Sequence, residues 1–584
     1  MPDPTNAQIA AALDELGDLY ELDGAIVHRV VAYREGARAV RDASVSVAGL
    51  AREGRAIELP GIGKTLQEKI VTLMETGDIP SAQRLREKFP AGLVDIVHAV
   101  PGMGPKRVRA LYDGLGIDSI EALEAATAAH EVRKLRGFGA KAEETIAAAL
   151  AAAAERGPEG QRRTILSRAL AIGEPIAAAL RDHPAADRVE LAGSARRLAD
   201  SVKDLDLIAT ANDPLALARA LHEIPAVQSV GTVSEAGARG VTHTGLKIDL
   251  KIVAPDQFGN LLQHFTGSKA HNMQLREAAV RRGLHVSEYG VLDDETGETL
   301  RCPTEEAVYE RLGYAWIPPE LREGRGEFEA SARGALPDLI DTADIRGDLH
   351  SHTTASDGKA TLEEMAQAAL ARGYEYLAVT DHSATHGFGN EVSPDDLRRH
   401  MDRVRALDGD LDGIRLLAGS EVNVLPDGSL DYDDDLLAQL DWVVASVHTS
   451  FRIGEAAMTE RMVRAVEHPL VDAIGHPTGR KIERRDSYPV DIGAVIEAAA
   501  RTGTMLEINA APDRRDLDDV HARAAAQAGV RILVNSDAHS TGNFELMRWG
   551  VATARRAWLT AGDVANTRAW AAFDALRKRK PAPA

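Results

Sequence analysis

The chain has 584 residues, of which 44% are hydrophobic and 27% charged, and at about 150 residues a domain this length predicts roughly four domains and excludes a protein with one small core. The 68 lysines and arginines are outnumbered by 89 aspartates and glutamates, giving a net charge of −21, so no overall positive field exists to hold nucleic acid nonspecifically and any DNA contact must be local. Cys302 is the single cysteine, so we expect no internal disulfide. No N-terminal segment resembles a signal peptide, and no apolar run approaches the ~20 residues of a membrane helix. We therefore expect a cytoplasmic location without membrane association.

The first third of the chain predicts helices, because Ala, Leu, Glu and Arg recur there at helical spacing between Gly and Pro breaks. Runs rich in β-branched residues begin only near Arg188, and those starting at Arg188, Asp204 and Gly245 predict strands of one mixed sheet. From Ile345 onward, short apolar runs alternate with helical stretches, which predicts parallel βα units in a barrel. We therefore expect a multidomain α/β protein with segments at 1–82, 83–157, 158–255, 256–323, a linker at 324–343, and 344–584.

One pattern occurs three times in the helical region, beginning at Leu59, Val100 and Leu135: an apolar residue, then Pro or Arg, and then two glycines around an apolar residue. A lysine and a helical stretch follow each copy; the lysines are Lys64, Lys106 and Lys141. Paired glycines permit a tight turn, and the amides that begin the next helix can take a phosphate. One copy is equally typical of an ordinary helix connection, but three favour a DNA grip. They resemble helix-hairpin-helix binders of the DNA backbone, with Arg136 replacing proline in the third copy.

The middle of the chain has a pattern suited to nucleotidyl transfer. Gly193-Ser194 follows a strand run and opens a helix, so its amides and hydroxyl can face an anion that Arg196 or Arg197 neutralises. Asp204 and Asp206 are two residues apart on a strand and point to one face. Taken alone, this spelling is more often a strand with acids on its solvent face.

A third acid, Asp249, lies in another strand run, and three oxygen ligands suit Mg²⁺ ions that assist phosphoryl transfer. This region resembles DNA polymerase family X, with a nucleotidyltransferase palm at 158–255 and a nucleotide-selection and thumb region at 256–323. The resemblance implies metal binding and catalysis by Asp204, Asp206 and Asp249, with Asp249 assisting deprotonation of the primer 3′-hydroxyl. The nucleotide-binding residues that it implies are Gly193, Ser194, Arg197, Phe265, Gly267 and Asn272: Ser194 and Arg197 for the triphosphate, Phe265 and Gly267 for the deoxyribose, and Asn272 for the minor groove.

Three positions depart from the family pattern. Leu198 and Lys203 stand where glycines usually approach the phosphates, and His264 stands where a tyrosine often precedes Phe265. These departures bear on polymerase efficiency and on exclusion of ribonucleotides. They leave open an alternative in which the palm is impaired and the chain is chiefly a nuclease.

The segments around His28-Arg-Val-Val-Ala-Tyr33 and Gln67-Glu-Lys69 resemble the small N-terminal domain of the same family. The resemblance implies that Lys69 forms a Schiff base with a 5′-deoxyribose phosphate, which would make 1–82 a lyase-like domain and 83–157 a second DNA-binding helical domain. An amine needs a lowered pKa for this chemistry. A solvated helix lysine is the equally weighted alternative.

The last region contains a series of His, Asp and Glu residues, most of which directly follow strand runs. Such residues meet at the mouth of a βα barrel, and imidazole with carboxylate suits Zn²⁺ or Mn²⁺ that activates water. A lone histidine is more often a core or surface residue, and this reading fits His386, His468 and His521. The series is His350, His352, Asp357, His382, Glu421, His448, His476, Asp537 and His539.

These nine residues resemble the ligand set of the polymerase and histidinol phosphatase (PHP) domain, which implies a distorted (β/α)7-type barrel at 344–584 that holds three metal ions. In bacterial family X polymerases this domain implies 3′–5′ exonuclease and abasic-site endonuclease activity, or a 3′-phosphatase. All nine positions match, which favours an active phosphoesterase. The basic tail from Arg577 is expected to be a frayed end, with a weak DNA-binding arm as the alternative.

The sequence therefore predicts a cytoplasmic enzyme of DNA repair, including base excision repair, that adds deoxynucleotides to a primer and carries a metal-dependent phosphoesterase. We expect Mg²⁺ or Mn²⁺ in the palm, a Zn²⁺ or Mn²⁺ cluster in the PHP domain, gapped or primed DNA and deoxynucleoside triphosphates as partners, and a monomer. The rivals are a nuclease with an impaired palm, a non-catalytic DNA-end-binding protein, and a small-molecule phosphatase fused to a polymerase.

Overall fold

The computed structural model describes residues 3–100, 103–156, 163–387 and 389–578. The chain folds into two compact units. Unit 1 comprises Met1–Thr164, Ala171–Leu191 and Lys203–Ala254, and unit 2 comprises Ile165–Leu170, Ala192–Val202 and Pro255–Ala584. Pro101 and Gly102 of the second glycine hairpin, and the basic tail from Arg579 onward, lie outside the described residues.

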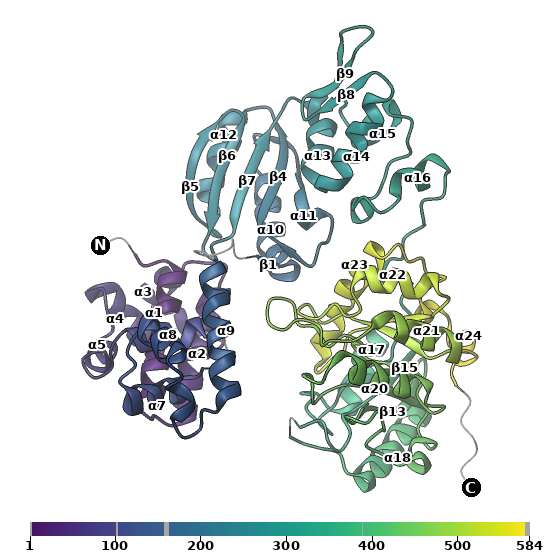
Figure 1. The fold of residues 1–584 in the computed structure, drawn as a ribbon. Helices are drawn as coiled ribbons and strands as arrows, with labels where there is room; N and C mark the ends of the chain where they lie inside the picture. Colours follow the sequence, from purple (N-terminus) through teal and green to yellow (C-terminus); the bar gives the residue numbers. More distant parts are fainter. Residues whose placement is uncertain (1–2, 101–102, 157–162, 388, 579–584) are drawn as a thin grey trace. The chain divides into compact units, whose positions relative to one another are not determined.

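The N-terminal region of unit 1 is helical, as predicted, and is drawn in purple and blue in Figure 1. The α-helices pack around apolar residues that recur on their inner faces, such as Leu13, Ile70, Leu111 and Ile146. Its elements are α1 (Asn6–Leu22), α2 (Val27–Asp42), α3 (Val47–Arg52), η1 (Ala56–Glu58), α4 (Lys64–Thr76), α5 (Pro80–Arg86), α6 (Gly92–Ala99), α7 (Pro105–Leu115), α8 (Ile120–Ala128), η2 (Val132–Lys134) and α9 (Ala140–Arg156).

Unit 1 also contains a five-stranded mixed sheet in the order β2-β4-β7-β6-β5. The strands are β2 (Ala186–Leu191), β4 (Asp204–Ala211), β5 (Val227–Ser234), β6 (Gly237–Thr242) and β7 (Lys247–Ile252). Strands β4 and β7 are parallel and the other neighbours antiparallel. The runs predicted as strands form β2, β4 and β7; the sequence did not indicate β5 and β6, whose Gly, Ser, Thr and Arg residues obscure the period. Helix α12 (Pro214–Ala220), with η3 (Leu221–Glu223), packs against β5 and β6, and α10 (Leu166–Arg181) begins in unit 2.

Unit 2 contains a small α/β region after the palm strands. Its antiparallel sheet has the order β10-β9-β8, and its core includes Leu275, Val308, Tyr309 and Phe328. The segment 324–343, expected to be a linker, includes α16 and is anchored by buried Phe328, so it packs against this core instead of connecting domains freely. The elements are β1 (Thr164–Ile165), α11 (Gly193–Arg196), β3 (Ser201–Val202), η4 (Pro255–Gln257), α13 (Phe258–Thr266), α14 (Lys269–Val280), β8 (Leu284–Ser287), β9 (Gly290–Asp293), β10 (Thr299–Leu300), α15 (Glu305–Arg311), η5 (Pro319–Leu321) and α16 (Glu327–Ala332).

The C-terminal region of unit 2 is a parallel barrel whose strands follow one another in sequence order from β11 to β17. A parallel bridge between Ser351 and Ala538 joins the segments after the first and last strands, so the barrel is nearly closed. Tyr376, Trp442 and Phe573 pack together in its inner core. The strands are β11 (Gly347–Asp348), β12 (Tyr376–Val379), β13 (Arg415–Asn423), β14 (Trp442–Ser446), β15 (Ala473–Ile474), β16 (Met505–Asn509) and β17 (Ile532–Asn535).

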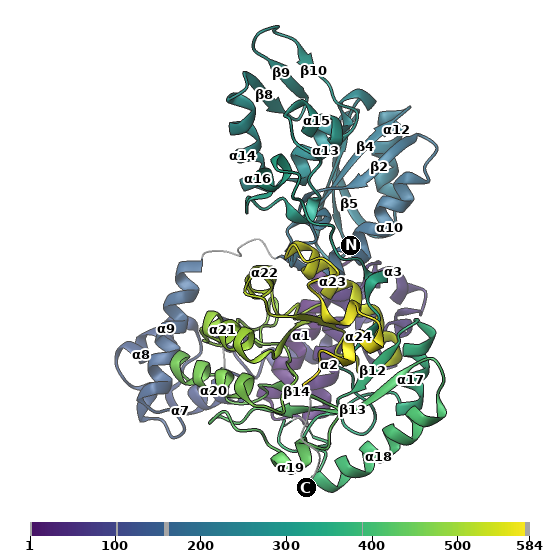
Figure 2. The same ribbon diagram turned by 90° about the vertical axis from the view of Figure 1, so that its right-hand side faces the viewer.

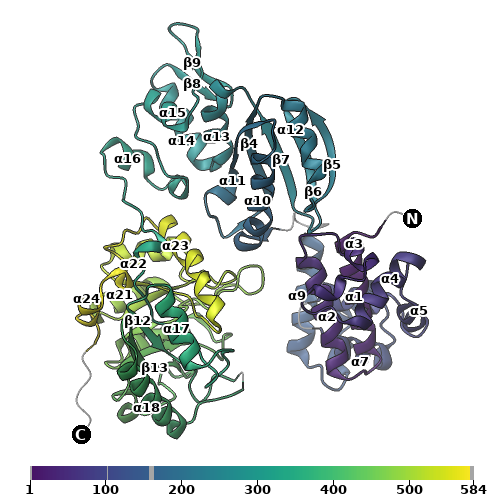
Figure 3. The same ribbon diagram turned by 180° about the vertical axis from the view of Figure 1, so that it is seen from behind.

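Helices cover the outside of the barrel, where a second core of Leu, Val, Ile and Ala residues separates them from the strands. Figure 2 shows α17 and α18 outside β12 and β13, and Figure 3 shows the same layers from behind. The fold class predicted from the sequence is confirmed. No helix among the described residues is long and apolar enough to cross a membrane. The covering elements are η6 (Thr342–Asp344), α17 (Leu362–Ala371), α18 (Pro394–Asp410), α19 (Asp434–Leu437), α20 (Glu455–Glu467), α21 (Ile492–Thr502), α22 (Asp519–Gln527), η7 (Thr541–Leu546), α23 (Met547–Arg556), η8 (Ala565–Thr567) and α24 (Trp570–Asp574).

Candidate active sites

The nine residues predicted to bind metal in the barrel domain lie where its strands end. Glu421 lies near the C-terminal end of strand β13. A parallel bridge joins it to His382, which follows β12. The carboxyl ends of parallel strands meet at one mouth of a barrel, so side chains far apart in sequence come together there. The other members are His350, His352 and Asp357 after β11, His448 after β14, His476 after β15, and Asp537 and His539 after β17.

Glu421 lies at the centre of the cluster. Its Oε1 is 2.9 Å from His476 Nε2 and 3.1 Å from His448 Nε2. Its Oε2 is 2.8 Å from His382 Nδ1. These four side chains are almost completely buried, so one carboxylate is surrounded by imidazole nitrogens.

Two aspartates complete the arrangement. Asp537 Oδ1 is 3.1 Å from His352 Nε2 and 3.6 Å from His350 Nε2. Asp357 Oδ2 is 3.3 Å from His539 Nε2. Among the described residues, three sets have ligand atoms within 4.8 Å of one another: His352 with Asp357, His382 and His539; His350 with His352 and Asp537; and His382 with Glu421 and His448.

The donor atoms of this cluster fit metal ions. His350 Nε2, both nitrogens of His352 and Glu421 Oε2 are buried and make no hydrogen bond within the described residues. Buried polar atoms normally have partners, and imidazole and carboxylate at this spacing are ligands for Zn²⁺ or Mn²⁺. The geometry therefore brings together all nine predicted residues in a set suited to hold metal.

The charges of the cluster shift the pKa values of its members in opposite directions. Burial lowers the pKa of His352 to about 4, and the neighbouring His539 and His382 rings add to the shift. Burial alone would lower the pKa of His382, but Glu421 and Asp357 outweigh it and raise the value to about 10. Since metal binding needs unprotonated imidazole, loading of this cluster should release protons and weaken as the pH falls.

The cluster opens into a pocket of about 400 Å³ that also contains Lys481, Arg514 and Asn543. Lys481 Nζ is 3.6 Å from Asp513, which also lines the pocket. Two cationic side chains beside a candidate metal cluster suit a phosphate group. Lys481 and Arg514 were not predicted from the sequence, because nothing in the surrounding residues distinguishes them from ordinary charged residues of a loop.

Glu507 is a third residue near the cluster that was not predicted from the sequence. This completely buried carboxylate in β16 lies 2.8 Å from His350 Nδ1 and accepts hydrogen bonds from the His476 amide at 2.7 Å and from Asn535 Nδ2 at 2.9 Å. A carboxylate on the outer nitrogen of a ligand histidine fixes its orientation and raises its basicity. A charged residue inside the apolar run Met505–Ile508 was the available signal.

His386, interpreted from sequence as an ordinary core or surface residue, is 1% exposed, and its ring stacks on that of His382 with centroids 4.5 Å apart. Asp381, next to His382, is also buried and accepts hydrogen bonds from the Thr353 and Ser356 hydroxyls at 2.7 and 2.6 Å. Both residues pack around the cluster, and Asp381 fixes the loop that leads to Asp357.

In unit 1, the three predicted palm aspartates share one face of the sheet. Along β4, Asp204 and Asp206 are partly exposed while Leu205 is buried, so the two carboxylates point to the same side. Asp206 is the register partner of Asp249 on the parallel strand β7. The three acids are therefore brought together as the strand period and the family resemblance predicted.

The oxygen atoms of this face are suited to hard cations such as Mg²⁺ or Mn²⁺. Asp249 Oδ1 is buried and accepts no hydrogen bond from the part of the chain that the structure describes, and Lys251 Nζ lies 3.3 Å from it. Asp249 Oδ2 is 3.6 Å from Arg239 Nε. Arg239 is mainly exposed. Asp249 thus has cationic neighbours on both oxygens, which the sequence did not indicate.

In unit 2, the two arginines that follow Ser194 have different surroundings. Arg196 forms a bidentate ion pair with Glu305, at 2.9 and 2.7 Å, and donates to Thr266 Oγ1 at 2.8 Å. Arg197 donates through Nη1 to the Thr266 carbonyl at 2.5 Å and through Nε to Glu323 at 3.1 Å. The sequence left either arginine available for phosphate; since Glu305 occupies both arms of Arg196, the geometry favours Arg197.

The predicted sugar and nucleotide residues lie where α13 ends and α14 begins. A Cβ on Gly267 would be 3.3 Å from Arg197 Nη1, and Gly267 has φ of +66°, so a glycine is required there. Asn272 donates to the His264 carbonyl at 2.7 Å, which places it in the first turns of α14 behind Phe265. Arg197, Phe265, Gly267 and Asn272 are therefore brought into one region of unit 2.

Comparisons with known proteins agree with this arrangement. Family models match residues 4–79 (helix-hairpin-helix domain), 95–152 (SAM-like helix-hairpin-helix tandem), 261–323 (DNA polymerase beta thumb) and 348–511 (PHP domain). The DNA polymerase/3′-5′ exonuclease PolX of Bacillus subtilis (strain 168) is 37% identical over 573 residues, covering 98% of this chain and 99% of that protein. The chain belongs to the family X DNA polymerases with a C-terminal PHP domain.

The PHP domain of this family X polymerase is also similar to separate proteins. A probable phosphatase of Caldanaerobacter subterraneus subsp. tengcongensis is 33% identical over 203 residues, covering 33% of this chain and 75% of that protein. A probable phosphatase of Acetivibrio thermocellus is 33% identical over 212 residues, covering 35% of this chain and 82% of that protein. About a third of this chain is thus similar to proteins named as probable phosphatases.

The three glycine hairpins of the family X polymerase share one local geometry. In each, a buried apolar residue donates its amide to the carbonyl three positions earlier: Ile62 to Leu59 at 3.0 Å, Met103 to Val100 at 3.0 Å and Phe138 to Leu135 at 2.9 Å. The second glycine of each pair and the lysine that follows are exposed. The described residues of the three copies thus share this hydrogen bond and an exposed lysine at the start of the following helix.

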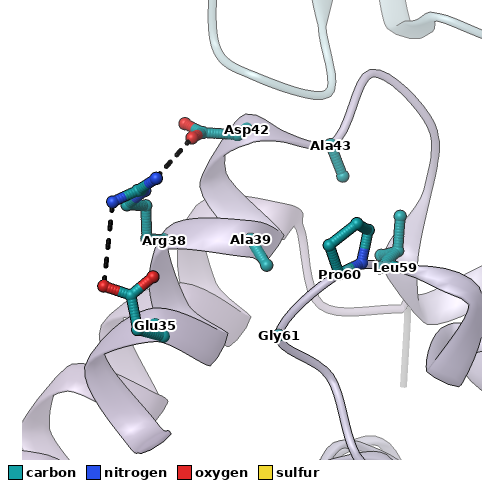
Figure 4. Close-up of a pocket in the computed structure, with 8 residues that line it drawn as sticks. All are labelled: Glu35, Arg38, Ala39, Asp42, Ala43, Leu59, Pro60 and Gly61. Atoms are coloured by element: carbon teal, nitrogen blue, oxygen red, sulfur yellow. Dashed lines mark ion pairs between the residues drawn. The ribbon is translucent and has the colours of Figure 1, made fainter. Parts of the chain in front are cut away.

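Figure 4 shows that the first hairpin also lines a pocket of about 400 Å³. Arg38 in this pocket forms ion pairs with Glu35 at 3.7 Å and with Asp42 at 3.9 Å. Two carboxylates and one guanidinium leave the pocket negative, so it does not suit phosphate. Phosphate contact by this hairpin is expected at exposed Lys64 and the amides that begin α4.

Lys69 lies in α4 of the same region. Its Nζ donates to Ser81 Oγ at 3.0 Å and lies 6.0 Å from the centre of the Tyr33 ring. It lines a pocket of about 260 Å³ together with Ser81 and Arg84. The pocket therefore combines two cationic side chains with one carboxylate, Glu68, and Lys69 is not a fully solvated lysine.

Proposed function

We propose that this family X polymerase adds deoxynucleotides to a primer 3′ end in gapped or primed DNA and that its PHP domain removes nucleotides in the 3′–5′ direction. One observation carries the proposal: a chain 37% identical over 98% of its length to a DNA polymerase/3′-5′ exonuclease has both the shared aspartate face of β4 and β7 and the nine-residue cluster at the barrel mouth. Two separate sets of ligands in different compact units support two separate reactions.

In the polymerase reaction, Asp204, Asp206 and Asp249 would hold Mg²⁺ or Mn²⁺, which when bound stabilises the charge of the phosphates and of the attacking oxygen. Asp249 would take the proton of the primer 3′-hydroxyl. Ser194, with Gly193, and Arg197 would bind the triphosphate, and Arg197 has its guanidinium held by backbone and by Glu323. Binding and orientation of this kind supply most of the catalysis in phosphoryl transfer.

Sugar selection would occur at the junction of α13 and α14. A Cβ on Gly267 would make a tight contact with Arg197 Nη1 at 3.3 Å, and Phe265 would face the deoxyribose. Asn272, whose amide nitrogen is bound to the His264 carbonyl, would contact the minor groove. His264 stands where a tyrosine often precedes Phe265. Burial lowers the pKa of His264, so a neutral imidazole would lie beside the sugar.

In the PHP reaction, the nine-residue cluster would hold Zn²⁺ or Mn²⁺, which when bound makes water acidic enough to attack a phosphodiester at neutral pH. Lys481 and Arg514 would bind the nonbridging oxygens of the phosphate, because both line the same pocket as Glu421 and His448. Glu507 would orient His350.

The N-terminal helices would bind DNA through the three hairpins and carry a 5′-deoxyribose phosphate lyase at Lys69, supported by the pocket that this lysine shares with Arg84. We propose the domain boundaries 1–82, 83–157, 158–255, 256–323, 324–343 and 344–584, a monomer without membrane association, and a cytoplasmic role in DNA repair. Few phosphate contacts on an acidic protein predict DNA binding that weakens steeply with salt.

A gapped-duplex assay with Mg²⁺ or Mn²⁺ tests the proposal. Wild type should extend the primer with deoxynucleotides and shorten it without them. Asp204→Ala/Asp206→Ala should lose extension only, and His350→Ala/His352→Ala should lose shortening only. Parallel loss of both activities in either variant, or shortening without extension in wild type, contradicts two working sites; the latter result indicates a nuclease with an impaired palm.

A second candidate is a phosphatase acting on 3′-phosphate ends, favoured by the similarity of the barrel to probable phosphatases. A primer with a 3′-phosphate distinguishes the two: release of phosphate without loss of a nucleotide indicates a phosphatase. An abasic-site duplex tests the endonuclease in the same experiment. A DNA-end-binding protein without turnover would give no product with any of these substrates.

A further inference from the structure

A short segment of the polymerase region, Arg197–Asp200, belongs to the same compact unit as the thumb and the PHP domain. It connects α11 to β3. Leu198 in this segment has φ of +56°, in the left-handed region that leucine rarely adopts. Such a conformation persists only where surrounding groups hold it. The side chains that bind this segment therefore determine its shape.

Two arginines of the PHP domain bind the end of the segment. Arg515, which follows β16 and has a side chain 1% exposed, donates through Nη2 to the Leu198 carbonyl at 2.9 Å. Its Nη1 is 3.3 Å from Asp200 Oδ1. Arg480, which follows β15, donates through Nη1 to Asp200 Oδ2 at 2.7 Å. Asp200 is thus held by the guanidinium groups of Arg480 and Arg515. Arg515 also binds the carbonyl of Leu198, the residue with the left-handed backbone conformation.

A third arginine, Arg556 at the end of α23, connects the other end of the segment to the thumb. Its Nη1 donates to the Arg197 carbonyl at 2.8 Å and to Glu323 Oε1 at 2.8 Å. The same Glu323 oxygen accepts a hydrogen bond from Arg197 Nε at 3.1 Å. The backbone and side chain of Arg197 are therefore both linked to Arg556, whose side chain is 8% exposed.

The positive charges of Arg515 and Arg480 keep the carboxyl group of Asp200 ionised. Burial would raise the pKa of Asp200, but Arg515 and Arg480 outweigh burial and lower it, so the carboxylate is charged. Arg480 also donates to the Arg515 carbonyl, which ties together the loops after β15 and β16. The side chain of Asp200 is 32% exposed, whereas those of Arg515 and Arg480 are 1% and 15% exposed. Removing the Asp200 charge would therefore leave two largely buried guanidinium groups without this partner.

We propose that Arg480, Arg515 and Arg556 of the PHP domain are positioning residues of the polymerase: they hold the Arg197–Asp200 segment, and through it the guanidinium of Arg197, in place for the triphosphate of the incoming nucleotide. This inference rests on the proposed triphosphate contact of Arg197. The PHP domain thereby serves two purposes, since its barrel mouth holds the nuclease cluster while the loops after β15 and β16 support nucleotide binding.

The test uses the full-length protein and compares Arg480→Ala, Arg515→Ala, Arg515→Lys and Asp200→Asn with wild type in single-nucleotide gap filling. The KM for the deoxynucleoside triphosphate should rise about tenfold or more in Arg480→Ala and Asp200→Asn, with a smaller change in kcat. Arg515→Lys keeps the charge but lacks the second arm, so its KM should rise less than that of Arg515→Ala. The increases in KM caused by Arg480→Ala and Asp200→Asn should be less than additive in the double variant, because the two residues share one contact.

Exonuclease activity without deoxynucleotides should stay within about twofold of wild type in Asp200→Asn, because this substitution leaves the loops after β15 and β16 unchanged and Asp200 does not line the barrel pocket. Arg501→Ala, on the exposed face of α21 where Arg501 pairs with Glu467, is the matched control and should change neither reaction. Hydrogen exchange of the amides of residues 197–200 should accelerate in Arg480→Ala and Asp200→Asn and not in the control.

An unchanged KM in both Arg480→Ala and Asp200→Asn overturns the inference, as does unchanged hydrogen exchange at 197–200. If Arg515→Ala fails to fold because its site is buried, the other two variants decide. If wild type itself does not extend primers, the proposed polymerase reaction fails, and the exchange measurement still shows whether the arginines hold the segment.

Discussion

Replacing Glu507 by glutamine tests whether this buried carboxylate controls metal binding in the PHP domain. The substitution keeps the size of the side chain but removes its charge and turns one acceptor into a donor. Glu507 faces nitrogen donors on every side: His350 Nδ1 at 2.8 Å, the His476 amide at 2.7 Å, and the amide groups of Asn535 at 2.9 Å and Asn509 at 3.2 Å. A glutamine nitrogen must therefore oppose at least one of them.

Loss of such a partner of a ligand histidine costs about 10- to 100-fold in metal affinity, which corresponds to about 1.4 to 2.7 kcal/mol. Glu507→Gln should therefore raise the Kd for Mn²⁺ or Zn²⁺ in a competitive chelator titration by this factor. Exonuclease activity should fall at low metal and recover in part at high metal, while gap filling stays within twofold. The exposed Glu467→Gln serves as the control, since Glu467 pairs only with surface Arg501 among the described contacts.

Equal metal affinity in Glu507→Gln and wild type would refute this reasoning. A loss of exonuclease activity that excess metal does not restore, with the Kd unchanged, would assign Glu507 to a different role in the reaction.

Three further changes have defined outcomes. Asp249→Asn should lower primer extension by about a hundredfold or more without affecting primer shortening, because a charged oxygen ligand beside Asp206 is lost; full extension activity contradicts this. Burial would raise the pKa of Glu305, but Arg322 and Arg196 lower it from 4.5 to about 2, so its ionised form contributes about 3 kcal/mol of stability that is complete above pH 4.5 and lost as the pH falls toward 2. Glu305→Gln should accordingly cost about 3 to 5 kcal/mol in urea unfolding at pH 7, since Arg322 is completely buried, and should remove that pH dependence; a midpoint equal to wild type at pH 7 is the contrary result. Lys69→Ala should abolish borohydride trapping of DNA that carries a 5′-deoxyribose phosphate and leave gap filling intact, whereas Lys88→Ala should trap as wild type does.

Much of the fold and of the candidate sites could be predicted because it depends on local patterns. The alternation of Asp204, Leu205 and Asp206 along one strand fixes which side chains share a face. The position of His350 directly after a short strand, and of Glu421 near the end of another, suffices to place both at a barrel mouth once the strand order is parallel. These relations need no knowledge of distant contacts.

The remaining features depend on contacts between residues far apart in sequence. Glu507 orients His350 across 157 positions, so the run around it reads only as a strand. The choice between Arg196 and Arg197 is made by Glu305, which lies 109 positions after Arg196 and takes both of its arms. Arg515 reads as an ordinary loop cation, because nothing local predicts that its guanidinium is buried.

The hydrogen bonds that Asp200 and Glu323 accept from the PHP domain also affect how the two activities are separated in the laboratory. Truncating the chain before the barrel to obtain an enzyme without exonuclease would remove Arg480, Arg515 and Arg556 and leave both carboxylates without these partners. Slow nucleotide incorporation by such a fragment would then be misread as an intrinsic property of the palm. A substitution confined to the metal cluster, such as His352→Ala, removes the nuclease while sparing those contacts, and it is the better starting material for an exonuclease-free enzyme.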